Sequence, residues 1–261
     1  MVKALLAAAA SLMGLAYAQS VLDSVPTDEL IGRLKANPAD MALVVELATR
    51  GGPQTIPVLK ESFLLARQTG TVTNVGVYWS QMIATFLIRL GAPDRIYFDE
   101  LAKYVRLAID ANPPVAGSDL DRARDPSAEF LAWCARNNLH GDACMLAVTH
   151  YAMDITMLGA SEDQRAIPIL REVLGLSNPV LVDAAVLRLG IFGDSASLPM
   201  IAAACGRFPA NDANVIGSAA ATFESPAMRL ALDKCVSDSS LKEALIKEWQ
   251  DKRGKTKDDQ H

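Results

Sequence analysis

Aromatic residues and histidines are scarce in this chain of 261 residues, and long runs of β-branched side chains are few. Aromatic residues make up 6%, and there are three histidines, His140, His150 and His261. Because aromatic and β-branched side chains favour strands, their scarcity argues against a fold built on sheets. Hydrophobic residues nevertheless make up 51%, with alanine and leucine dominant, which excludes disorder over most of the chain and favours helices.

The short motifs of common catalytic and nucleotide-binding sites are also missing. The chain contains no Walker, Rossmann or His-Glu-x-x-His motif, and no histidine is followed by glutamate. Cys134, His140, Cys144 and His150 are clustered, but their spacing matches no established zinc pattern. We therefore expect neither a metal nor a cofactor.

Positive charge is not in excess, since the formal net charge is −5. The one basic cluster, Lys252 to Lys257, stands among aspartates near the C-terminus. Binding to phosphates requires a basic face, so the sequence indicates a partner other than nucleic acid.

Residues 1–18 are typical of a secretory signal peptide. Lys3 precedes an apolar run from Ala4 to Leu15, and Ala16-Tyr17-Ala18 forms an A-x-A cleavage site before Gln19. A membrane anchor or a buried first helix is the alternative, but the run is shorter than the ~20 residues that span a bilayer. We expect an exported protein, periplasmic or extracellular, with no membrane span after cleavage.

The rest of the chain divides at breaks rich in proline and glycine. Residues 19–111 are predicted to form N-terminal helical repeats, and residues 112–126, which include Pro113-Pro114, an irregular loop. Residues 127–249 form a second set of repeats, and residues 250–261 a polar tail that we expect to be disordered.

One pattern recurs along the chain: a cap residue, then an aliphatic residue and a proline four and five positions later. It occurs at Gly52–Pro57, Asp163–Pro168 and Asp194–Pro199. The last two copies lie 31 residues apart, and each follows a Leu-Gly break, Leu158-Gly159 or Leu189-Gly190. A fixed period between about 20 and 50 residues indicates a repeat architecture.

Each copy leads to expectations about local structure. The aspartate is expected to cap the first helix of a pair, and the proline, one turn inside that helix, to bend it. The second helix, Val180 to Leu189, is apolar almost all round, so it should be enclosed by its neighbours, with Leu187 buried.

Gly159 to Leu170, the following helix that ends at Gly190, and Gly193-Asp194 resemble the HEAT repeat, in particular its short bilin-lyase-type form. The resemblance is good over residues 155–236, fair over 51–110 and poor over 112–140. It implies an all-α fold, an α-solenoid of HEAT-like helical hairpins coiled as a right-handed superhelix. Some HEAT-like enzymes hold di-iron with His-Glu pairs, which this chain lacks.

HEAT-like arrays are mostly protein-binding scaffolds, so the resemblance implies a non-catalytic protein that binds a protein or peptide on its concave face. Tyrosine and tryptophan often anchor interfaces, and we expect Trp79 and Tyr97 to be exposed for this purpose. Two alternatives stay open: an enzyme whose site combines scattered carboxylates with His150, and a structural subunit of an envelope complex.

The four cysteines of an exported chain usually form disulfides. Cys134 and Cys144 flank a turn at Asn138 to Gly141, so a helical hairpin would bring them together. Cys205 and Cys235 hold nearly equivalent positions in successive repeats, although packed helices lie about 8–10 Å apart and a disulfide needs Cα atoms within about 7 Å. Four buried free thiols are the alternative.

Overall fold

The computed structural model describes residues 22–72, 78–92, 94–115, 126–223 and 225–258. This part of the chain is helical and contains no strand, which confirms the all-α fold class. Its one β-type contact is an isolated antiparallel bridge between Val72 and Tyr78. The predicted signal peptide, residues 1–18, and residues 116–125 of the predicted loop lie outside the described residues.

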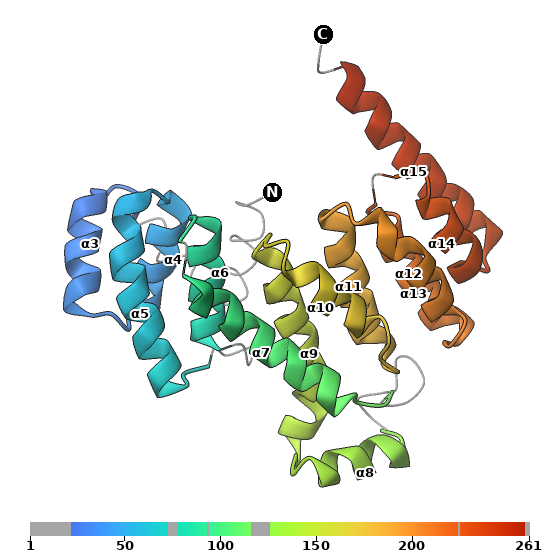
Figure 1. Ribbon diagram of the computed structural model, residues 1–261, viewed down its shortest axis with the longest axis horizontal. Helices are drawn as coiled ribbons and strands as arrows, with labels where there is room; N and C mark the ends of the chain where they lie inside the picture. The colour runs from blue at the N-terminus through green and yellow to red at the C-terminus, as the bar shows by residue number, and fades with distance from the viewer. Residues whose placement is uncertain (1–21, 73–77, 93, 116–125, 224, 259–261) are drawn as a thin grey trace. The chain divides into compact units, whose positions relative to one another are not determined.

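The helices are α3 (Thr27–Ala36), α4 (Met41–Arg50), α5 (Ile56–Thr69), α6 (Trp79–Arg89), α7 (Arg95–Ala111), α8 (Ala128–Arg136), α9 (Asp142–Ala160), α10 (Ala166–Val173), α11 (Pro179–Ile191), α12 (Leu198–Cys205), α13 (Ala210–Ala220), α14 (Met228–Cys235) and α15 (Ser239–Asp258) (Figure 1). Two short 3-10 helices, η1 (Pro53–Thr55) and η3 (Ser195–Ser197), directly precede α5 and α12.

Side-chain caps fix several helix starts. The carboxylate of Asp40 accepts a hydrogen bond from the Leu43 amide at 3.2 Å, and the hydroxyl of Ser127 accepts one from Phe130 at 3.1 Å. Asn178 does the same for the amide of Val180 at the start of α11. Each cap satisfies one of the amides that the first turn of a helix leaves without a backbone partner.

The chain forms two compact units. Unit 1 comprises Met1–Lys103 with Ala160–Asp163, and unit 2 comprises Tyr104–Gly159 with Gln164–His261. The division therefore falls inside α7 rather than in the irregular segment at 112–126. Helix α7 is continuous across it, with its first nine residues in unit 1 and the remainder in unit 2.

Unit 1 is built on the helices α3 to α6, which pack pairwise around fully buried leucine, isoleucine and phenylalanine side chains. Two buried carboxylates are neutralised inside it. Glu46 pairs with Arg50 at 2.6 Å, and Arg50 also donates to the carbonyls of Leu22 and Val25. Glu100 accepts a hydrogen bond from Ser80 and pairs with Arg67 at 3.1 Å, so each of the two carboxylates has a cation beside it.

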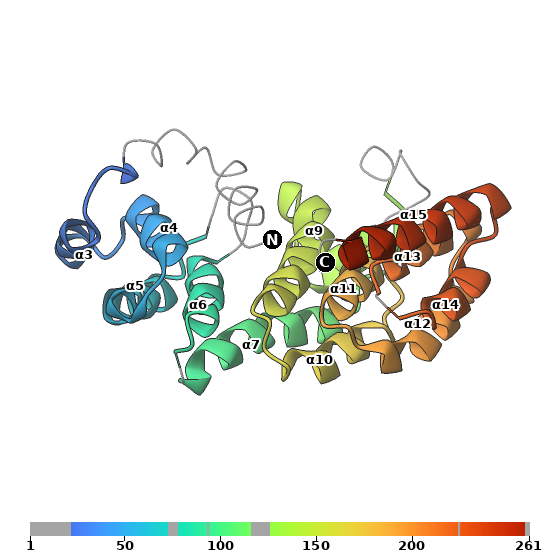
Figure 2. The same ribbon diagram turned by 90° about the horizontal axis from the view of Figure 1, so that it is seen from above.

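Unit 2 contains helical hairpins that repeat in space. Helices α10 and α11 pack together, as do α12 and α13, and α14 contacts α15. Between hairpins, α11 packs on α13 and α12 packs on α14 (Figure 2). The first helices thus lie in one layer and the second helices in another, with the buried aliphatic side chains between them.

The repeated prolines start their helices instead of bending them. Pro57 and Pro199 are the second residues of α5 and α12, and Pro168 is the third residue of α10. The amides of the first turn have no intrahelical partner, so proline costs no hydrogen bond there and its fixed φ suits the helix. The predicted kink is wrong because these helices begin three residues later than the sequence pattern indicated.

The repeated aspartates do not cap the first helices of the pairs. Helix α10 begins at Ala166, well after Asp163, and α12 begins at Leu198 after a 3-10 turn. The Asp194 carboxylate instead accepts two hydrogen bonds from Arg171 of the preceding hairpin, with N–O distances of 2.5 and 2.9 Å. Ser197 also donates to it. Asp194 is therefore a link between hairpins.

The Arg171–Asp194 link gives a testable contribution to stability. Burial opposes ionisation of Asp194, but the hydrogen bonds from Arg171 and Ser197 and the charge of Arg171 outweigh it and lower the pKa. We expect Asp194→Ala to reduce the free energy of unfolding by about 2 kcal/mol at pH 7.

The pH dependence follows from the lowered pKa of Asp194. Its contribution is present above the ordinary value of 3.8 and is lost as the pH falls through the lower folded value, where the variant and wild type converge. Urea denaturation of wild type and Asp194→Ala at pH 7 and pH 3 measures the difference in unfolding free energy and its decrease at low pH. The control is Asp233→Ala, whose exposed pair with Lys242 should contribute less than about 0.5 kcal/mol.

Glycines that were expected to break the helices lie inside them. Gly159 is the penultimate residue of α9, and Gly190 that of α11. A Cβ at Gly159 would lie 2.6 Å from the Cβ of Arg188, and one at Gly190 would lie 3.1 Å from the Cβ of Thr222. A residue with positive φ lies two positions beyond the end of each helix, Glu162 at 59° and Gly193 at 68°, and these two residues are 31 positions apart. The two internal glycines therefore serve close packing.

The C-terminal tail differs from the prediction made for it. The tail predicted to be disordered from residue 250 is helical as far as Asp258, which agrees with its content of lysine, glutamine and arginine, all good helix formers. Among the described helices, α9 alone is long and apolar enough to cross a membrane by length and composition, and 44% of its apolar window is buried in the fold. The absence of a membrane span stays a prediction.

Candidate functional site

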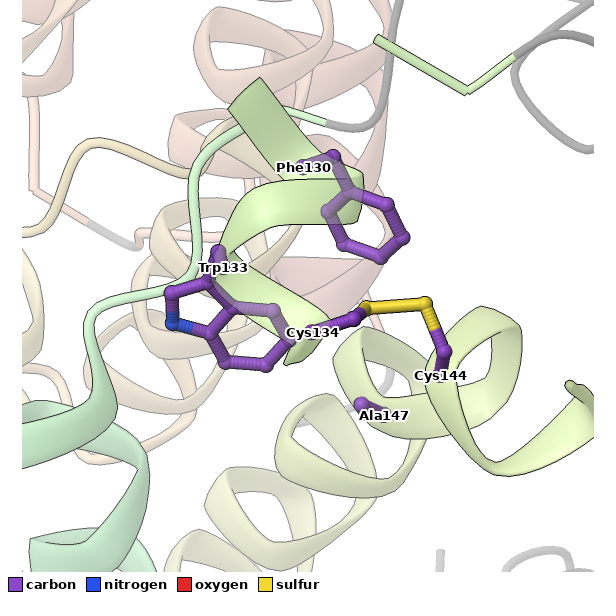
Figure 3. Close-up of a cluster of buried hydrophobic side chains, with 5 residues drawn as sticks. All are labelled: Phe130, Trp133, Cys134, Cys144 and Ala147. Atoms are coloured by element: carbon purple, nitrogen blue, oxygen red, sulfur yellow. A yellow bond between two sulfur atoms is a disulfide. The ribbon is translucent and has the colours of Figure 1, made fainter. Parts of the chain in front are cut away.

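The structure places both expected cysteine pairs at disulfide distance. Cys134 lies in the last turn of α8 and Cys144 in the first turn of α9. Their Cα atoms are 5.5 Å apart. The disulfide lies against Phe130, Trp133 and Ala147 in a buried cluster (Figure 3). The indole of Trp133 donates to the carbonyl of Ala111 at 2.8 Å, so this hairpin is fixed both covalently and by packing.

The second pair joins α12 to α14. The Cα atoms of Cys205 and Cys235 lie 5.1 Å apart, closer than the usual spacing of packed helices. Both cysteines are the last residues of their helices, and small buried residues, Ala204 and Ala231, lie near them in the sequence. Small side chains let the backbones approach, which explains how repeats can be linked at this position.

The structure contradicts one of the two predicted aromatic anchors. Tyr97 is 2% exposed, and its ring packs edge-to-face on Phe63 with centroids 4.9 Å apart. Burial, with the charge of Asp94, raises its pKa. Tyr97 is thus a core residue of unit 1. Trp79 is half-buried at the first position of α6, and a binding role for it stays a prediction.

An exposed apolar stripe runs along α11. Val180, Leu187 and Ile191 are 42%, 37% and 41% exposed, and their spacing of i, i+7 and i+11 places them on one side of the helix. The expected burial of Leu187 is therefore wrong. The helix is enclosed on its other sides, where its remaining large aliphatic side chains are buried.

Two charged side chains flank this stripe. Asp183 and Arg188 are the only charged residues of α11, and helical geometry places them on opposite sides of the Val180–Leu187–Ile191 line. Both are half-buried. In the part of the chain that the structure describes, neither side chain has an ion pair or a hydrogen bond. We call these five residues the α11 face.

Burial shifts the pKa of both charged side chains. It raises the pKa of Asp183 from 3.8 to about 6 and lowers the pKa of Arg188. A carboxylate that is partly desolvated and has no cation beside it reduces the stability of the folded state whenever it is ionised.

Asp183→Asn should therefore stabilise the protein. The full shift corresponds to about 3 kcal/mol, and solvent screening at this half-buried site reduces the expected gain to about 1 kcal/mol, or roughly 3 °C in Tm. The wild-type cost is present above pH 6 and disappears as the pH falls toward 3.8, so the gain should do the same. Thermal melts at pH 7.5 and pH 4 measure it. A variant that is less stable than wild type at pH 7.5 would show that Asp183 has an internal partner.

Helix α13 extends the α11 face. It packs beside α11, and a Cβ at Gly190 would contact Thr222, just beyond the end of α13 (Figure 2). Val215 on α13 is 55% exposed. Two neighbouring helices of the same layer therefore present uncovered aliphatic side chains.

A groove of about 470 Å³ lies on the other layer of unit 2, and its charged side chains, unlike those of the α11 face, have partners within the fold. Its apolar lining includes Met200 and Ala203, and its charged residues are already occupied. Arg171 binds Asp194, Glu172 pairs with Arg106, and Arg207 donates to the carbonyls of Leu174 and Gly175. These interactions connect elements of the fold, so the groove has no unused charge to offer a ligand.

Unit 1 contains a cavity of about 460 Å³. It is lined by the ends of α4 and α6 and by Ser161 and Glu162. Its ionisable side chains, Arg89 and Glu162, pair with each other at 3.0 Å. His150 belongs to unit 2, where burial lowers its pKa, and it does not line this cavity.

The described residues contain no group of three or more His, Cys, Asp or Glu side chains that could hold a metal ion. Among the buried carboxylates, Glu46 and Glu100 form internal ion pairs. Asp183, by contrast, is accessible and unpartnered within the described residues, and its surroundings on the α11 face are apolar.

Comparison of this chain with protein-family models, with curated proteins and with solved structures gives no significant match.

Proposed function

We propose that this chain is an exported, non-catalytic interaction scaffold that binds a protein or peptide on the α11 face. In this proposal the helical hairpins form a HEAT-like α-solenoid with a right-handed superhelix, and the layer of second helices lines its concave side. The pairwise packing of α11 on α13 and of α12 on α14 supports the stacked arrangement.

One observation carries the proposal. The α11 face combines exposed aliphatic side chains with two charges that no group in the described chain neutralises. Ordinary surface charges stay fully hydrated, and ordinary core helices are covered. A partner that covers the stripe would remove its apolar surface from water and supply the missing counter-charges.

Export is supported by the cysteines. All four are paired, and disulfides persist in oxidising compartments such as the periplasm or the extracellular space. This agrees with the signal peptide that the sequence predicts at residues 1–18.

Site-specific photo-crosslinking tests the proposal. A photoreactive amino acid replaces Leu187, or, as a matched control, Leu230, which is 46% exposed on α14 in the other layer. We expect a discrete crosslinked protein from position 187 and none from position 230. Leu187→Asp, combined with a crosslinker at position 180, should abolish the product. Equal crosslinking at 187 and 230 would overturn the proposed face.

The enzyme alternative is not favoured by the geometry. A catalytic site requires ionisable groups that converge on a pocket and are free to exchange protons or bind substrate. The described cavity in unit 1 contains a neutralised ion pair, and Asp183 lies on an open helix face.

A further inference from the structure

We infer that the partner segment is an amphipathic α-helix that lies along α11, with a lysine or arginine beside Asp183 and an acidic residue beside Arg188. This inference rests on the proposed function of the α11 face and adds the form and charge pattern of its ligand.

The backbone chemistry of α11 selects a helical ligand. The amides and carbonyls of α11 are bonded within the helix, so its side offers an incoming peptide only side chains. A sheet edge binds an extended peptide by strand addition, through backbone hydrogen bonds that a helix face cannot supply. A helical ligand satisfies its own backbone and presents side chains alone.

The dimensions of the stripe agree with this form. Val180 and Ile191, at the two ends of the stripe, lie eleven positions apart on α11, which corresponds to about 16 Å at 1.5 Å per residue. A partner helix of about 12–16 residues with apolar side chains at i, i+4, i+7 and i+11 covers this length. The neighbouring helix α13 carries a further exposed aliphatic side chain, Val215.

The charges set the orientation of the ligand. An apolar seam with one charge on each flank is the arrangement by which paired helices choose partners and register. Asp183 and Arg188 lie on opposite flanks and five residues apart, so the two flanks of the ligand must carry opposite charges. The raised pKa of Asp183 supports the same conclusion, because a cation placed beside it would restore the ordinary ionisation.

A charge-selection experiment with displayed peptides tests this inference. The probe is a library of 16-residue helical peptides with leucines fixed at the seam and Lys, Glu or Gln varied at the flanking positions. It is selected on the full, oxidised protein and on the variants Asp183→Asn, Asp183→Lys and Leu187→Asp. Sequencing gives the enrichment of each charge at each flank.

We expect lysine to exceed glutamate by about tenfold on one flank and glutamate to exceed lysine on the other, as for a partly desolvated charge pair. Asp183→Asn should remove the lysine preference, Asp183→Lys should reverse it to glutamate, and Leu187→Asp should abolish selection. Far-UV circular dichroism of each variant checks that it folds.

The outcomes separate this inference from the proposed function. If crosslinking at position 187 captures a partner but the library shows no charge preference, or one that Asp183→Lys does not reverse, then the helical, charge-matched ligand is wrong and the binding face is retained. If position 187 captures nothing and the library is not enriched, both are overturned.

Discussion

Val186→Asp is expected to unfold the hairpins around α11, whereas Leu187→Asp, one residue later, should leave the melting transition almost unchanged. Val186 is fully buried, and an aspartate there would be a charge without a partner in an apolar interior. Such substitutions cost about 4 kcal/mol or more, a large fraction of the stability of an ordinary domain.

The neighbouring position provides the internal control. Leu187 is 37% exposed, so its carboxylate variant can keep its hydration, and we expect a change within about 0.5 kcal/mol. Circular dichroism melts of both variants under oxidising conditions measure the difference. If both variants have the same lowered melting temperature, the assignment of the exposed side of α11 is wrong.

Removal of the Cys205–Cys235 disulfide is expected to have the next largest effect. The bridge closes a loop over a sequence separation of 30, against 10 for Cys134–Cys144. In the loop-entropy account these correspond to about 3.5 and about 2.5 kcal/mol of stabilisation, because a longer loop restricts the unfolded chain more.

Two double variants measure these contributions, Cys205→Ser with Cys235→Ser and Cys134→Ser with Cys144→Ser. Urea denaturation should show the larger loss for the first, and addition of reductant to wild type should approach the sum of the two. A larger loss for Cys134–Cys144 would show that contacts of the buried sulfurs with Trp133 and its neighbours outweigh chain entropy.

The helical class and one of the two cysteine pairs could be predicted from the sequence. Composition is sufficient for the first, since alanine and leucine favour helix and strand-forming residues are few. For the second, the short turn between Cys134 and Cys144 favoured that pair, whereas the usual spacing of packed helices argued against the pair of Cys205 and Cys235 that the structure also contains.

Exposure could not be predicted in the same way. The sequence of α11 is apolar on every side, so periodicity cannot tell which side a neighbouring helix covers, and Leu187 was assigned to the wrong one. Tyr97 is buried by Phe63, which lies 34 positions earlier, and no local pattern reports such a contact. A usable signal for the site was present, since Asp183 and Arg188 are the only charges in an otherwise apolar helix.

The role of the repeated residues was also beyond the sequence pattern. Asp194 and Pro199 belong to a pattern that recurs with a clear period, but the first helices begin three residues later than this pattern indicated. Whether an aspartate caps its own helix or binds Arg171 of the preceding hairpin depends on which side chains lie opposite, and this is decided only by packing.

Gly159 and Gly190 act as spacers for the layer that contains the α11 face. Each lies directly against the next second helix or the residues just beyond its end, and a single methyl group would overlap the side chain of Arg188 or Thr222. An alanine at either position would act as a wedge between neighbouring helices, and at Gly159 it would also displace the side chain of Arg188 on the α11 face. The separation of the helices in this layer is therefore limited by two buried glycines, and a change at either of them would alter the width of the α11 face.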